Sequence, residues 1–249
     1  CLLPFLNKAF HIDDPLFVWT AKHIVQHPAD FYGFSLNWFN HAMRMADMSP
    51  NPPLVAYYLA LGGLLLGWTE IAIHAAFIIP AAAAALGTFY LARRLCRRPT
   101  LATLAAVLTP GFLVSGTTVM SDMTMLAFWV WAVLLWVRGI QGNRALFLWL
   151  GALLIAPCTL AKYIGLALIP LLFAYSLAAR RRLGWWVLPL LLPVAVVGAY
   201  EWVNYLLYGH GLLADAAAYT TKYATTQSLQ GGATPIQIVL MTLTFAGGC

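Results

Sequence analysis

Long runs of apolar residues recur along the chain and are separated by short polar segments. A helix needs roughly 20 apolar residues to cross a bilayer. Backbone inside lipid must satisfy its own hydrogen bonds, so these runs predict membrane-spanning α-helices. The alternating polar and apolar positions of membrane β-barrel strands are absent from the sequence. The predicted spans in the central and C-terminal parts are Leu101–Thr117, Met123–Val137, Ala145–Ala161, Tyr163–Ala179 and Trp185–Leu206.

The two ends of the sequence are also apolar. The stub Cys1–Leu6 and the run Ile236–Ala246 both read as parts of spanning helices, so we expect the chain to be truncated at both ends. The segment Leu207–Pro235 between spans is expected to be a loop. No repeat and no soluble domain is recognisable, and residues 1–249 are predicted to form a single transmembrane domain.

Composition supports this fold class. The chain is 62% hydrophobic and 9% charged, whereas a soluble domain carries about 25% charged residues. An all-α, polytopic transmembrane helical bundle is therefore predicted. The net charge is +6, but most arginines cluster in three short loops, which is the pattern of cytoplasmic loops rather than of a nucleic-acid-binding groove. These loops contain Arg93, Arg94, Arg97 and Arg98; Arg138 and Arg144; and Arg180, Arg181 and Arg182.

The N-terminal region allows two topologies, because Pro53–Trp68 and Ile71–Leu95 are both apolar. If both runs crossed the membrane, the preceding segment would be cytoplasmic. The first run is short, rich in glycine and begins with two prolines, and the preceding segment contains more Asp than Lys and Arg. We favour the second topology, in which residues 8–70 form an outer loop with interfacial helices.

The eight carboxylates then fall on or near the outer side of the membrane, away from the arginine loops. Acidic residues close to the hydrocarbon are costly and often mark functional sites. We therefore expect the chemistry on the non-cytoplasmic side. The carboxylates are Asp13, Asp14, Asp30, Asp47, Glu70, Asp122, Glu201 and Asp215.

Two acidic positions are candidates for catalysis. In Asp13-Asp14-Pro15, the proline suits the first helical residue, so Asp14 is predicted as the N-cap and Asp13 lies free beyond it. Asp122 lies between two predicted spans. The alternative is that these residues only cap helices at the membrane interface.

Basic residues on the outer side are candidates for binding an anion. Lys162 lies between two apolar helices, where it either contacts a phosphate or extends to the interface as a topology anchor. Lys22 is a weaker candidate. The histidines and cysteines show no spacing typical of a metal site, and no metal or other cofactor is predicted.

Several short motifs, in order, resemble a known family. They are the acidic pair Asp13-Asp14, then NPPLVAYY from Asn51, GWTEIAIH from Gly67, MSDM from Met120 and LAKY from Leu160. The sequence resembles the GT-C glycosyltransferases of family 39, which include protein O-mannosyltransferases and the lipid A aminoarabinose transferase. The resemblance covers nearly the whole chain as the N-terminal membrane half of such a protein.

The resemblance implies transfer of a sugar from a polyprenyl-phosphate donor to the hydroxyl of a lipid, glycan or protein acceptor, with inversion at the anomeric carbon. It assigns Asp13 as the catalytic base. Asp14 is a second catalytic candidate, although the family usually has a glutamate, with its longer side chain, at this position. Asn51 takes the place of a histidine, so the role of that histidine does not transfer. Asp122 is assigned as a further catalytic residue and Lys162 as a donor contact.

The quoted motifs also imply that Tyr57 and Tyr163 contact substrate. A bacterial inner membrane, with the active site facing the periplasm, is the expected location. Three other classes remain open, one of which is another polyprenyl-linked enzyme, such as a ligase or a flippase-like factor. A secondary transporter would place its ionisable groups near the membrane midplane, and a non-catalytic scaffold would place Asp13 and Asp122 on divergent faces.

Overall fold

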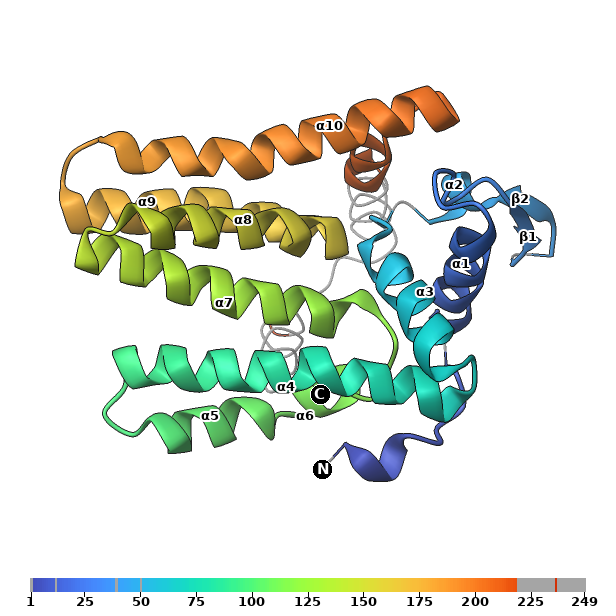
Figure 1. Cartoon of the computed structure of the whole chain (residues 1–249), viewed down its shortest axis with the longest axis horizontal. Coiled ribbons are helices and arrows are strands. Elements are labelled where there is room, and N and C mark those ends of the chain that lie inside the picture. The colour runs from blue at the N-terminus through green and yellow to red at the C-terminus, as the bar shows by residue number, and fades with distance from the viewer. Residues whose placement is uncertain (1, 12, 39, 50, 219–235, 237–249) are drawn as a thin grey trace.

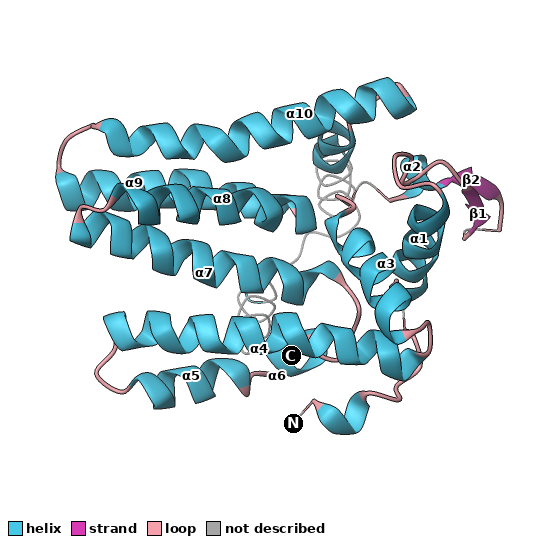
Figure 2. Cartoon of the chain, in the orientation of Figure 1, coloured by secondary structure: helices cyan, strands magenta, loops and turns pink. Residues whose placement is uncertain are grey.

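The computed structural model describes residues 2–11, 13–38, 40–49, 51–218 and 236. Apart from one small hairpin, its regular elements are helices (Figure 2). In chain order they are η1 (Leu3–Phe5), α1 (Asp14–Gln26), β1 (Ser35–Asn37), β2 (Ala42–Arg44), α2 (Met45–Met48), α3 (Leu54–Leu66), α4 (Glu70–Leu95), α5 (Pro99–Val107), α6 (Pro110–Ser115), α7 (Ser121–Gly142), α8 (Ala145–Ala161), η2 (Tyr163–Ala167), α9 (Leu168–Arg180), η3 (Trp185–Leu190), α10 (Leu191–Tyr208) and a helical segment over residues 212–218.

The long helices α4, α7, α8, α9 and α10 form a bundle with roughly aligned axes (Figure 1). Within the described residues, four helical segments are long and apolar enough to cross a membrane, and α8 is a shorter apolar helix of 17 residues inside the bundle. The predicted all-α transmembrane bundle is confirmed, and the protein is a multi-pass integral membrane protein. The four segments are Glu70–Leu95, Ser121–Gly142, Tyr163–Arg180 and Trp185–Tyr208.

Small residues allow the bundle helices to approach closely. A Cβ atom on Gly87 of α4 would lie 2.5 Å from the Val130 side chain of α7, and one on Gly151 of α8 would lie 3.2 Å from the Ala132 carbonyl oxygen. Helix contacts in membranes depend on such packing and on buried hydrogen bonds. One such bond joins α7 to α9, where Trp136 Nε1 donates to Ser176 Oγ at 2.8 Å.

The three arginine loops lie at the same end of the bundle (Figure 1). Arg94 at the end of α4 donates to the Gln141 side chain at the end of α7, at 2.9 Å. Arg180 at the end of α9 donates to the Ile140 carbonyl oxygen at 2.7 Å and to the Asn143 side chain at 3.0 Å. The parity of the predicted spans therefore agrees with the arrangement of the helices.

The opposite end of the bundle is covered by residues 8–70, which fold into α1, the β1–β2 hairpin, α2 and α3 (Figure 1). The hairpin pairs Ser35 with Arg44 and Asn37 with Ala42, and the sequence analysis did not predict it. Helix α3 has 13 residues, about 20 Å in length, and it is not among the candidate spans. That these helices lie at the membrane interface stays a prediction. Placement of the region outside the cytoplasm stays a prediction.

The predicted single span Leu101–Thr117 is wrong. The chain instead forms the separate helices α5 and α6, which Leu108 and Thr109 interrupt. Pro110 has no N–H to donate and disfavours helical geometry in the residue before it. Thr109 is accordingly extended, with ψ 144°, and its side chain caps α6 by accepting from Phe112 N.

The structure describes the predicted ends of the domain only in part. In the stub Cys1–Leu6, the described residues contain only the single turn η1. The predicted loop Leu207–Pro235 is helical at Leu207 and Tyr208 and again over residues 212–218. The rest of that loop, and the run Ile236–Ala246 apart from its first residue, lie outside the described residues.

Candidate active site

Asp13 lines a cavity of about 970 Å³ at the end of the molecule opposite the arginine loops. Pro15 is tolerated in the first turn of α1, where a backbone N–H would have no helical partner. Asp13 is the N-cap residue, but its side chain makes no capping bond. Its carboxylate therefore makes no hydrogen bond to the N–H groups at the start of α1. The other lining residues are Leu16, Phe17, Thr20, Tyr32, Trp38, Met43, Met45, Ala46, Asp47, Met48, Ser49, Asn51, Ala56, His210, Asp215 and Ala216.

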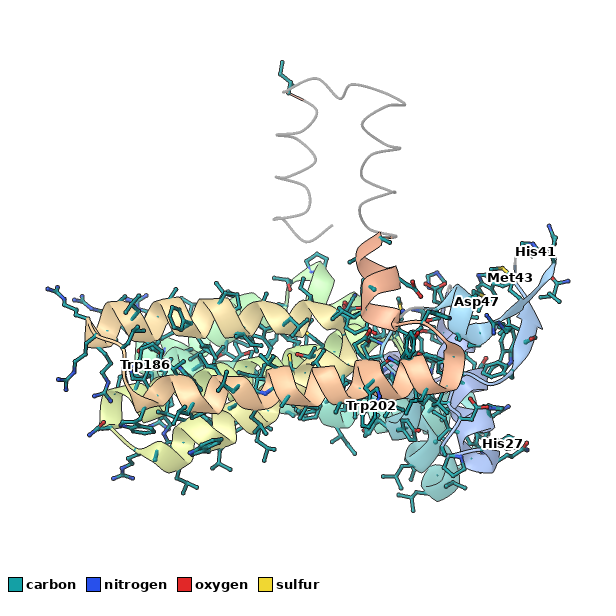
Figure 3. The ribbon with its side chains drawn as sticks, turned by 90° about the horizontal axis from the view of Figure 1, so that it is seen from above. His27, His41, Met43, Asp47, Trp186 and Trp202 are labelled. Atoms are coloured by element: carbon teal, nitrogen blue, oxygen red, sulfur yellow. The ribbon has the colours of Figure 1, made fainter. Side chains whose placement is uncertain are left out.

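A histidine and a carboxylate that follow α10 meet a carboxylate of α2 at this cavity. His210 Nδ1 lies 2.5 Å from Asp215 Oδ2, and His210 Nε2 lies 3.4 Å from Asp47 Oδ1. Arg44 pairs with Asp47 through Nε at 2.8 Å and through its terminal nitrogen at 3.0 Å. The hydrogen bond from Arg44 holds the pKa of the Asp47 carboxyl below its ordinary value. Asp47 lies at the end of the molecule remote from Trp186, which follows an arginine loop (Figure 3).

Asp14 is placed differently from its neighbour and from the prediction. It is the first residue of α1 rather than its N-cap, and its side chain is completely buried. One carboxylate oxygen accepts from His11 N at 3.0 Å, and the other accepts from Val119 N at 3.0 Å. The prediction that Asp14 caps α1 is therefore wrong, because both of its oxygens bind backbone N–H groups outside the helix.

Asp122 and Lys162, which the sequence analysis singled out separately, form an ion pair. Asp122 lies in the first turn of α7, and Lys162 follows the last residue of α8. Lys162 Nζ lies 2.6 Å from Asp122 Oδ1, with the two side chains 38% and 37% exposed. Neither residue lines the Asp13 cavity. The Asp14–Val119 bond nevertheless joins the two places, because Val119 is three residues before Asp122.

Tyrosine and phenylalanine side chains fill the space between residues 8–70, called the first loop below, and α10. Tyr200 stacks on Phe31 with ring centroids 6.3 Å apart, and its hydroxyl lies 3.5 Å from that of Tyr163. Tyr208 accepts from Tyr32 N at 2.9 Å and donates to Asp30 Oδ1 at 3.0 Å. These contacts fasten α10 to the first loop beside the cavity. Burial raises the pKa of the Tyr32 hydroxyl well above its ordinary value, so this cavity-lining group is a neutral hydrogen-bonding group near pH 7.

The remaining predicted contacts lie away from the cavity. The Tyr57 hydroxyl donates to the Pro28 carbonyl oxygen at 2.6 Å, which indicates a structural role. Lys22 is exposed and its Nζ lies 5.6 Å from the centroid of the Trp68 ring. Tyr163 belongs to the aromatic contacts with Tyr200. The structure therefore does not bring these three side chains together with Asp13.

An apolar groove of about 470 Å³ lies between α3, α4, α7 and α8. Thr124 at this groove is two residues after Asp122 on α7, a rise of about 3 Å and a rotation of about 200° around the helix axis. Ile79 at this groove is 65% exposed, as expected for a residue that faces lipid. The lining residues are Leu54, Tyr58, Ile79, Pro80, Ala83, Thr124, Ala127, Phe128, Trp131 and Leu154.

The sequence analysis missed the convergence of Asp47, His210 and Asp215. Both carboxylates were recognised as outer-side acids, but His210 stands in no motif, and no spacing connects Asp47 with His210 and Asp215, which are more than 160 residues later in the sequence. Gly209, whose φ is 81°, ends α10 in the left-handed conformation and was the one local signal that the chain turns there. Within the part of the chain that the structure describes, no group of three or more His, Cys, Asp or Glu side chains is placed to hold a metal ion.

A family model described as dolichyl-phosphate-mannose-protein mannosyltransferase matches residues 50–208, well over half of the chain. The matched region contains Asp122 and Lys162, whereas Asp13 and Asp14 precede it. Comparisons with curated proteins and with solved structures found no match. The chain therefore belongs to the dolichyl-phosphate-mannose-protein mannosyltransferase family and is a membrane glycosyltransferase of the GT-C type.

Proposed function

We propose that the protein transfers a sugar from a polyprenyl-phosphate donor to an acceptor hydroxyl, with Asp13 as the general base. The observation that supports this proposal most strongly is the position of Asp13. Its carboxylate lines a large cavity and makes no capping bond. The next residue, Asp14, accepts a hydrogen bond from Val119 N, three residues before Asp122. A carboxylate with access to a substrate cavity is suited to accept a proton from an attacking hydroxyl.

The reaction is a single displacement. The acceptor oxygen forms a bond to the anomeric carbon while the bond from that carbon to the phosphate oxygen breaks. The hydroxyl proton passes to Asp13, and the lipid phosphate leaves with the electron pair of the broken bond. A nearby cation lowers the barrier because it stabilises the charge that develops on the phosphate.

Lys162 is the cation that we assign to the phosphate. A lysine ammonium has three N–H donors, and the structure shows one engaged by Asp122 at 2.6 Å. The side chain is 38% exposed, so a phosphate has access to it. Asp122 then acts by holding the ammonium in place rather than by accepting a proton itself.

The groove between α3, α4, α7 and α8 suits the isoprenoid chain of the donor. Its exposed lining is almost entirely apolar, and it begins within one turn of Asp122. A lipid bound there would keep its tail among the transmembrane helices while its phosphate reached Lys162. This arrangement supports a lipid-linked donor over a water-soluble nucleotide sugar.

The distribution of charge supports an active site on the non-cytoplasmic side. The arginine loops gather at one end of the bundle, and the cytoplasmic loops of membrane proteins are enriched in Lys and Arg. Asp13 and Asp122 lie at the other end. We therefore place the transfer reaction at the outer surface, facing the periplasm if the protein resides in a bacterial inner membrane.

The same distribution argues against a secondary transporter, whose ionisable groups lie near the membrane midplane. Glu70 and Asp122 lie in the first turns of α4 and α7. Glu201, inside the last spanning segment, accepts from Leu213 N at 3.0 Å, which ties it to the chain beyond α10. Asp122 does not line the Asp13 cavity, which is the arrangement expected of a non-catalytic scaffold. The match to a mannosyltransferase family and the Asp14–Val119 hydrogen bond between the starts of α1 and α7 favour an enzyme instead.

The test is a donor panel. The full-length protein, in lipid vesicles with membrane extract as the source of acceptor, is incubated with radiolabelled mannosyl polyprenyl phosphate or with radiolabelled GDP-mannose. We expect label to enter a product only from the lipid-linked donor. Transfer from the nucleotide sugar in vesicles depleted of polyprenyl phosphate would refute the proposed donor class.

Sidedness requires a separate measurement. In a cysteine-free background, a cysteine at Lys8 or at Arg181 is treated with a membrane-impermeant maleimide added from the outer side of intact cells. We expect labelling at position 8 and none at position 181. The reverse pattern would place the cavity in the cytoplasm.

A further inference from the structure

Asp14 is a buried carboxylate whose two oxygens are both occupied by backbone donors. Its exposed fraction is 0%, and it accepts from His11 N and from Val119 N, each at 3.0 Å. A buried charge is tolerated only when it is paired or well hydrogen-bonded. With its oxygens engaged and no route to solvent, Asp14 is unsuited to accept a proton from a substrate.

The bond to Val119 links two parts of the proposed active site. On one side, Asp14 is the residue next to Asp13 and begins α1. On the other, Val119 is itself completely buried and precedes Met120, the N-cap of α7. Asp122, which holds Lys162, lies in the first turn of that helix. The Asp14 carboxylate thus fastens the start of α1 to the start of α7.

We propose that Asp14 is a positioning residue that sets the separation between the base Asp13 and the cation Lys162. This inference rests on the proposed function. Asp13 must reach the acceptor hydroxyl while Lys162 reaches the leaving phosphate on the other side of the same anomeric carbon. A single displacement requires both distances at once, and a misplacement of about 1 Å can lower the rate by roughly 100-fold.

The substitution Asp14→Asn alters this link with little change in volume. An amide has one acceptor oxygen and two N–H donors, so it can accept from only one of the two backbone N–H groups. Its NH₂ group would face the other N–H, leaving two buried donors without an acceptor. Asp14→Ala removes both bonds. The matched control is Glu70→Gln, the same chemical change at an exposed residue in the first turn of α4.

The experiment measures label transfer from radiolabelled mannosyl polyprenyl phosphate to membrane acceptors as a function of donor concentration and pH. For Asp14→Asn we expect the maximal rate to fall about 10- to 100-fold. The apparent KM for donor and the acidic limb of the pH–rate profile should stay unchanged, because Lys162 and Asp13 are both retained. Glu70→Gln should match the unmodified protein in all three quantities.

Hydrogen–deuterium exchange supplies a readout that does not depend on turnover. We expect the peptide that contains the Val119 amide to exchange faster in Asp14→Asn and in Asp14→Ala, since that N–H loses its acceptor. Faster exchange with an unchanged maximal rate would reduce the Asp14–Val119 bond to a purely structural contact and overturn the proposal. A shift of the acidic limb in Asp14→Asn would also overturn it, because Asp14 itself would then be titrating in the reaction.

Two further outcomes separate this inference from the function on which it rests. Each rate is measured below the midpoint of thermal unfolding of that variant, so that loss of folding is not mistaken for loss of positioning. If Asp13→Asn keeps its activity, the proposed function fails. If Asp13→Asn is inactive while Asp14→Asn transfers sugar at the unmodified rate, only the positioning role fails.

Discussion

Removal of the Lys162 ammonium should weaken the use of the lipid donor far more than it weakens the fold. Lys162 and Asp122 approach to 2.6 Å, but both side chains are more than one third exposed. An exposed ion pair of this kind contributes about 0–1 kcal/mol to stability. A hydrogen bond to a charged group at an active site contributes more, about 1.5–3 kcal/mol.

The two magnitudes distinguish a donor contact from a topology anchor. If Lys162 binds the leaving phosphate, a loss of 1.5–3 kcal/mol lowers kcat/KM for the donor by about 10- to 150-fold. The apparent KM for mannosyl polyprenyl phosphate should rise in Lys162→Ala, and the temperature of unfolding in detergent should change little. Lys162→Arg keeps the charge and should recover part of the loss, although the planar guanidinium differs in geometry from an ammonium.

The assay is the donor titration with label transfer as the readout, at equal amounts of inserted protein. Arg144→Gln is a suitable control, because it deletes a cation at the opposite end of the bundle, where Arg144 lies 6.0 Å from the Phe147 ring centroid. We expect this control to titrate like the unmodified protein. An unchanged donor KM and rate in Lys162→Ala, with lowered insertion or thermal stability, would show that Lys162 only anchors the helix end.

Three further predictions concern the groove, the bundle and the cavity. Ala83→Phe should fill the apolar groove and raise the KM for a long-chain donor but not for a short-chain analogue. Gly165→Ala should lower the free energy of unfolding by about 1–3 kcal/mol, because the new Cβ would lie 2.6 Å from the Thr159 backbone nitrogen. Gly198→Ala, whose Cβ would have no atom within 4 Å, should not lower it. Equal melting temperatures for the two variants would contradict this prediction. Because Arg44 lowers the pKa of Asp47, the stabilisation from this pair is complete above the ordinary Asp pKa, near 4, and is lost as the pH falls through the lower folded-state pKa. Arg44→Gln should therefore reduce protease resistance mainly above pH 4 and converge with the unmodified protein in stronger acid.

The transmembrane bundle was predictable from sequence because lipid imposes a strong constraint. Apolar length and arginine position alone indicate helices and their parity. Helices α4, α7 and α8 lie close to the predicted ranges, as do the segments Tyr163–Arg180 and Trp185–Tyr208, which begin with the turns η2 and η3. The error at Leu101–Thr117 has a local cause. Apolar length suggested one helix, but Pro110 inside the run separates α5 from α6.

The candidate site was predictable only in part. Asp13, Asp122 and Lys162 stand out because charge is rare in this sequence. Nothing in their spacing showed that Lys162 pairs with Asp122, or that only Asp13 of the three lines the cavity. The predicted N-cap position of Asp14 was wrong, and its partner Val119 was not predictable because it contributes a backbone N–H, which no side-chain pattern reveals. Asp215 is only five residues after His210, but Asp47 meets His210 through the long-range packing of residues 8–70 against the end of α10.

The most direct test of sugar transfer by an Asp13 base is the rate of label transfer from mannosyl polyprenyl phosphate by Asp13→Asn, compared with the unmodified protein and with Glu70→Gln at equal membrane insertion. An amide at position 13 cannot take up the proton of the attacking hydroxyl. We therefore predict that the rate of Asp13→Asn falls to background while Glu70→Gln keeps its full rate. Turnover by Asp13→Asn at the rate of the unmodified protein would contradict the account.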